Sequence, residues 1–191
     1  MLPITVALIA GAAQASATAA PPSDVIGRMV ALYDEVCLKT FPSDTEVDAL
    51  MARKGAKPLT VDEVKVTLGS DPGRGWLIKD GERDIQVYLE LPPYHACTVR
   101  RMTPAGMEDD SAYRQVVEPY KATHAGFAPG GGMDTDMGEL HVHAVTEART
   151  LPDGSSDSLM VFDQRIKDPA RRAKNESAVS LRFVHQLRVA D

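Results

Sequence analysis

The chain has 191 residues, of which 43% are hydrophobic and 25% are charged, so it can form a hydrophobic core and is not wholly disordered. Its 27 acidic and 21 basic residues give a formal net charge of −6, which disfavours a surface built to bind nucleic-acid phosphates. We therefore expect one globular domain and no nucleic-acid partner.

The N-terminal region has the pattern of an export signal. The first 23 residues contain no charged side chain, and residues 4–13 form an apolar run that is too short to span a bilayer. Residues 15–17 and 17–19 both match the small-residue sites of signal peptidase. We predict a signal peptide over 1–19, a single domain over 20–191, and a periplasmic or secreted protein without a membrane span. A disordered alanine-rich tail is the alternative.

Three helices are predicted in the first third of the chain. Apolar residues recur at helical spacing from Val25 to Cys37, and Phe41-Pro42 ends this first helix. The segments 43–46 and 60–63 each match a capping box, in which a hydroxyl and a carboxylate bind free backbone N–H groups. The second helix should therefore end at Gly55 and the third at Gly69.

Alternating apolar and polar residues predict strands in the rest of the chain. The predicted elements are a hairpin, a third short strand, a helix over 110–124 and three further strands. Their ranges are 76–78, 85–91, 97–102, 139–148, 158–167 and 177–189. Gly130-Gly131-Gly132 is interpreted as a flexible connector. We expect an α+β domain with three N-terminal helices, then an antiparallel sheet of five or six strands interrupted by one helix, with helices covering one face.

The two cysteines, Cys37 and Cys97, are 60 residues apart. An even number of cysteines in an exported chain favours a disulfide, which would clamp the first helix to the third strand. A redox role would more typically show Cys-x-x-Cys, which is absent. The alternative is a shared metal site, because His95 stands two residues before Cys97.

His141-Val142-His143 is the strongest candidate for a chemical site. Residues two apart share one face of a strand, so both imidazoles can bind one metal ion, and Glu147 lies on the same alternation. The preceding segment 133–137 adds two methionines and two aspartates. The spacing of His141, His143 and Glu147 also resembles half of the first cupin motif, although Thr135 replaces its leading glycine and the second motif is missing. The alternative is an ordinary solvated strand face.

Several structural features lie between residues 24 and 102. They are the Cys37-x3-Phe41-Pro42 join, the capped helix ending at Gly55, the Gly75-Trp76 strand entry and the Tyr94-His95-x-Cys97 segment. Together they resemble small exported proteobacterial proteins of unknown function. The resemblance implies export and a cysteine bridge, and it implies no activity.

No local signature of nucleophilic catalysis or of a phosphate-binding loop occurs in the sequence. Catalytic groups can still assemble in space, so this leaves the question of an enzyme open. We expect a soluble binding or accessory protein whose partner is a small molecule or an envelope protein, without a cofactor. The alternative is a metal-binding protein or metalloenzyme that holds a divalent transition metal with His141, His143 and Glu147.

Overall fold

The fold is a mixed α+β arrangement around one antiparallel sheet. The structure is a computed structural model that describes residues 25–81, 83–103, 106–107, 109–174, 176 and 180–189. The predicted signal peptide lies outside these residues. No helix in the described ranges is long and apolar enough to cross a membrane.

The described residues form eight strands in the order β1-β2-β3-β4-β8-β7-β6-β5, with every neighbouring pair antiparallel. The strands are β1 (Lys57–Pro58), β2 (Gly73–Ile78), β3 (Ile85–Glu90), β4 (Ala96–Met102), β5 (Ala128–Met137), β6 (Leu140–Thr150), β7 (Ser156–Ile166) and β8 (Ser180–Arg188). The sheet therefore consists of two meanders, β1–β4 and β5–β8. The pairing of β4 with β8 joins them at the centre of the sheet.

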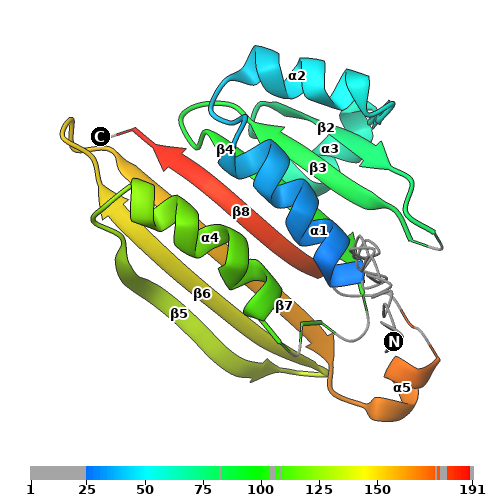
Figure 1. Ribbon diagram of the computed structural model, residues 1–191. Helices are drawn as coiled ribbons and strands as arrows, with labels where there is room; N and C mark the ends of the chain where they lie inside the picture. The colour runs from blue at the N-terminus through cyan, green and yellow to red at the C-terminus, as the bar shows by residue number, and fades with distance from the viewer. Residues whose placement is uncertain are drawn as a thin grey trace, which may run out of the picture.

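The helical elements lie on both faces of this sheet. They are α1 (Val25–Tyr33), the π-helix η1 (Asp34–Leu38), α2 (Asp44–Arg53), α3 (Val61–Leu68), α4 (Ser111–Thr123) and α5 (Pro169–Ala173). Figure 1 shows α1 and α4 side by side on the face toward the viewer, which we call the front face. The main core lies between these helices and the sheet, with Tyr33, Tyr113 and Phe183 in mutual ring contact.

The prediction that helices cover one face is wrong for α3. Val99 points into the core at the front, so its neighbour Arg100 must point to the opposite face, which we call the back face. The Arg100 guanidinium donates to the Thr67 hydroxyl of α3 at 2.7 Å, which places α3 on the back face. In α3 only Val64 is buried, while Val61 and Val66 are exposed. The helix therefore buries little apolar surface against the sheet.

The predicted number of strands, five or six, is also too low. The main omission is β5, of which residues 130–132 are interpreted from the sequence as a flexible connector. β5 is an edge strand that pairs with β6 at Ala128, at Pro129 and from Gly132 to Met137, so one side of its backbone is hydrogen-bonded although all ten of its residues are exposed. Because glycine has no side chain, this segment shows no alternation of apolar and polar residues, and periodicity does not predict a strand there. β1 is missed because it has only two residues.

The predicted first helix consists of two parts. It is α-helical through Tyr33 and then widens into η1, where the Lys39 N–H donates to the Asp34 carbonyl and the Phe41 N–H to the Val36 carbonyl. The turn carries the buried Cys37 to Cys97 on β4, where the two cysteines form the expected disulfide with Cα atoms 5.4 Å apart. The disulfide therefore clamps the first helical segment to the sheet.

Candidate functional site

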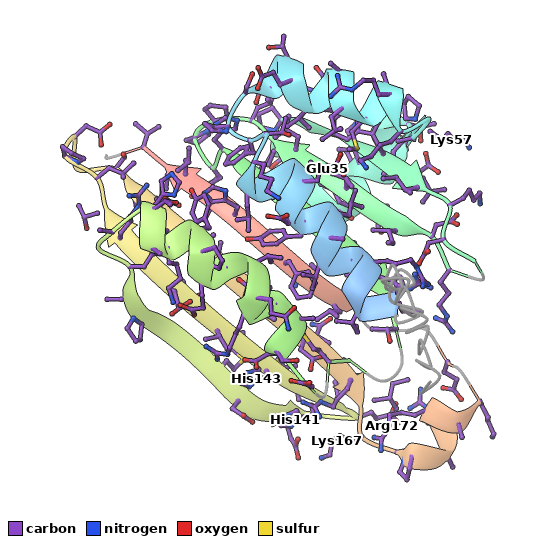
Figure 2. The ribbon with its side chains drawn as sticks, viewed as in Figure 1. Glu35, Lys57, His141, His143, Lys167 and Arg172 are labelled. Atoms are coloured by element: carbon purple, nitrogen blue, oxygen red, sulfur yellow. A yellow bond between two sulfur atoms is a disulfide. The ribbon has the colours of Figure 1, made fainter. Side chains whose placement is uncertain are left out.

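The two histidines of β6 lie on the front face of the sheet, opposite two aspartates of β5. The register pairs His141 with Asp136 and His143 with Asp134. Asp134 lies between the two imidazoles, with one carboxylate oxygen 3.1 Å from His143 Nδ1 and the other 3.2 Å from His141 Nε2. Figure 2 shows both histidines near the end of the sheet where α4 begins.

Asp136 contacts the other ring nitrogen of His141. Its carboxylate lies 3.1 Å from His141 Nδ1 and 2.6 Å from Lys167 Nζ. The hydrogen bonds from Lys167 and His141 lower the pKa of Asp136, so its carboxylate is ionised at neutral pH. The His141 ring is thus held between two carboxylates.

The third predicted ligand, Glu147, is not brought to the histidines. It lies four residues beyond His143, about 13 Å along the strand. Its carboxylate accepts a hydrogen bond from Lys121 Nζ of α4 at 2.6 Å. Within the residues that the structure describes, no group of three or more His, Cys, Asp or Glu side chains is arranged to hold a metal ion. A metal site at these histidines would have to use Asp134 in place of Glu147.

A cleft of about 630 Å³ opens on the front face between α4 and the β5–β6 ladder. Its floor contains Leu159 and Val161 of β7, and Gly130, Gly131 and Gly132 form part of its wall. Nothing lies within 4 Å of the position that a Cβ atom would take at Gly131, so backbone borders open space there. The glycine segment therefore widens the cleft at the edge of the sheet.

The lining of this cleft is predominantly acidic. Five carboxylate side chains line it, against two guanidiniums and one histidine: Asp109, Asp110, Glu118, Asp134, Glu147, Arg114, Arg165 and His143. Several of these charges are paired: Arg114 lies 2.7 Å from Asp110, Lys121 lies 3.1 Å from Glu118 and 2.6 Å from Glu147, and Arg165 lies 3.4 Å from Asp163. Five lining carboxylates still outnumber these three cations, so the cleft retains a formal excess of negative charge.

Asp163 is a buried carboxyl group beside this cleft that the sequence analysis missed. Its side chain is 1% exposed, and it accepts a hydrogen bond from the Met107 N–H at 3.1 Å, whereas its Oδ1 atom has no partner. Burial raises the pKa of Asp163, and Met107, Arg165 and the two histidines offset only part of this effect. The sequence offers one signal for this residue. Asp163 shares the strand alternation of Leu159 and Val161, which places a charged residue at a core position.

Asp157 marks a second buried polar group at the other end of β7. One of its oxygens lies 2.9 Å from His185 Nε2 and the other accepts from Arg149 Nε at 2.8 Å. His185 Nδ1 lies 2.6 Å from the Cys37 carbonyl, which can only accept. Burial alone would raise the pKa of Asp157, but His185 and Arg149 outweigh it and lower that pKa. This group therefore ties the disulfide segment to β7 and β8.

No family model, curated protein or solved structure matches this chain in the comparisons made with known proteins.

Proposed function

We propose that this chain is an exported binding protein that holds a small cationic ligand in the front-face cleft. The observation that carries this proposal is the acidic lining of a space of about 630 Å³, which is in the size range of small-molecule sites. Carboxylates attract ammonium groups, and apolar residues at the floor can contact the hydrocarbon part of such a ligand. No catalytic step is part of the proposal.

Spermidine is a suitable cationic probe, and succinate is its anionic counterpart. We expect calorimetric titration to give saturable binding of spermidine, and any binding of succinate should be unaffected by substitutions in the cleft. Asp134→Asn and Glu118→Gln should each weaken spermidine binding at least fivefold, because each removes one carboxylate from the lining. Asp62→Asn, which removes an exposed carboxylate from α3, should leave binding unchanged. Absence of saturable binding, or equal binding by all variants, would refute the proposal.

Export is supported by the uncharged N-terminal segment, by the resemblance to exported proteins and by the disulfide, a bond that forms in oxidising compartments. Intact-mass measurement of protein from a periplasmic fraction should show the loss of 17 or 19 residues. Recovery of the full-length chain from the cytoplasm would contradict this part of the proposal.

A second candidate function is binding of a divalent transition metal by His141 and His143. The specific support is that both imidazoles lie two residues apart on one face of β6, with the Asp134 carboxylate between them. These side chains would have to shift to become ligands, because the described residues hold no ready group of three. Zinc titration of the whole protein should then give saturable binding that weakens in acid, because a protonated imidazole cannot bind a metal ion. His143→Ala should abolish most of this affinity, whereas His124→Ala, at the end of α4, should preserve it. Zinc binding that survives His143→Ala would refute this candidate.

A further inference from the structure

Two arginines lie directly opposite each other at the centre of the back face. Arg100 of β4 pairs in register with Arg182 of β8, and Arg182 pairs with Phe162 of β7. Opposed residues of antiparallel strands have Cβ atoms about 4.5–5.5 Å apart. The Arg182 guanidinium lies over the Phe162 ring, 4.8 Å from its centroid. The two side chains therefore leave the sheet next to each other on the back face, with the Arg182 guanidinium over Phe162 and the Arg100 guanidinium at Thr67 of α3.

These two side chains differ from four other arginines in or beside the sheet. Arg74, Arg101, Arg149 and Arg165 each form an ion pair with an aspartate. Neither Arg100 nor Arg182 forms an ion pair with any carboxylate of the described residues. Like charges placed directly opposite each other destabilise a sheet. At this pair no aspartate offsets the repulsion, as one does at the four arginines above.

The hydrogen-bonding capacity of the pair is also incomplete. Arg100 donates to Thr67 and to the Met102 sulfur, but its Nε atom is buried without a partner. The Nε atom of Arg182 is likewise buried without a partner. Burial and the neighbouring Arg100 both lower the pKa of Arg182, which is the direction expected for a cation that lacks a counterion. Both side chains remain partly exposed and can be reached from solvent.

We propose that Arg100 and Arg182 form a binding site for a small oxyanionic ligand, a phosphate or carboxylate group held between the two guanidiniums. An oxyanion would supply the missing counterion, and planar guanidiniums bind such groups through paired N–H donors. The Phe162 ring supports one guanidinium from the sheet side. This site is independent of the front-face cleft and has the opposite charge preference.

The test uses inorganic phosphate and succinate as probes on the whole protein at constant ionic strength. Calorimetric titration should show saturable binding of at least one of the two probes. Binding of phosphate or of succinate then shows whether the site prefers a phosphate or a carboxylate group. Arg182→Gln is the decisive variant because the Arg182 side chain makes no hydrogen bond among the described residues, and it should weaken binding at least tenfold. Arg100→Gln should have a similar effect. Arg53→Gln, at the exposed end of α2, removes the same charge elsewhere and should change nothing.

Thermal unfolding provides a second measurement that separates this site from a structural role. In buffer without phosphate or succinate, Arg182→Gln should melt at or above the temperature of the wild type, because the substitution removes like-charge repulsion. The bound anion should raise the melting temperature of the wild type but not that of the variant. The proposal is overturned if neither anion binds saturably, or if binding persists in Arg182→Gln.

Discussion

Asp157 and Asp163 lie on the same face of β7, and both are almost completely buried. Asp157 is paired with His185 and Arg149, and its pKa is lowered; Asp163 has an unpartnered oxygen, and its pKa is raised. At neutral pH, ionisation of Asp157 therefore favours the folded state, whereas ionisation of Asp163 opposes it. The two carboxyl groups can be distinguished by the pH dependence of unfolding.

For Asp163 we predict that the wild type loses stability relative to Asp163→Asn as pH rises from about 4 to about 7. A raised pKa means that the folded protein binds more protons than the unfolded chain above the ordinary carboxyl pKa, so ionisation is unfavourable to folding. Urea denaturation at several pH values measures the difference in the free energy of unfolding. A difference that stays constant over this range would contradict the prediction.

For Asp157 we predict that Asp157→Asn lowers the free energy of unfolding by about 3–5 kcal/mol at neutral pH, because buried His185 and Arg149 lose their carboxylate. The lowered pKa means that this stability is present above the ordinary carboxyl pKa and is lost as pH falls through the folded-state pKa. The wild type and the variant should therefore converge in acid. Asp62→Asn is the exposed control and should change stability by less than about 0.5 kcal/mol.

At the scale of elements, the two predicted capping boxes have different outcomes. Thr60 accepts a hydrogen bond from the Glu63 N–H, and the Glu63 carboxylate accepts one from the Thr60 N–H, so the box at α3 is complete. Ser43 precedes α2 with no side-chain hydrogen bond to the helix. The same sequence pattern therefore describes one formed cap and one that is absent.

We predict that Thr60→Ala lowers the free energy of unfolding by about 1 kcal/mol, the usual contribution of a helix cap. Ser43→Ala is the matched comparison and should have a clearly smaller effect, since no capping bond is lost. Chemical denaturation of both variants measures this difference. Equal losses in the two variants would show that the caps contribute alike.

Most elements with strong side-chain periodicity were predictable from the sequence. The helix around Tyr113 and Val117 and the alternating strands β6, β7 and β8 lie within a few residues of their predicted ranges. The elements that sequence reasoning missed lack such a pattern: β5 is rich in glycine, and β1 and the five-residue helix α5 are very short. Their pairing depends on partners that are distant in sequence, which local periodicity does not encode.

The candidate site was predictable only in part. Alternation correctly places His141 and His143 on one face, but the partner strand and its Asp134 depend on a register that only the folded sheet defines. Glu147 shares the alternation yet lies too far along the strand and pairs with Lys121 from α4. The opposed Arg100 and Arg182 are 82 positions apart in the chain, so no local motif could connect them.

At the scale of the whole molecule, the disulfide joins the helical layer to the sheet across a separation of 60 residues. We predict that the double variant Cys37→Ala/Cys97→Ala has a free energy of unfolding about 2–5 kcal/mol below that of the oxidised wild type. Reductant should lower the stability of the wild type toward this value and leave the variant unaffected. Two freely reactive thiols in native oxidised protein would contradict the prediction.

The position of β8 between β4 and β7 has a consequence for how the chain folds. β2–β4 and β5–β7 can each pair as local meanders, but the ladder that unites them requires β8. Contacts between β4 and β8 span a long loop, and such contacts form slowly. We therefore expect the two halves of the sheet to form before the ladder that unites them, and deletion of β8 should leave two separate half-sheets.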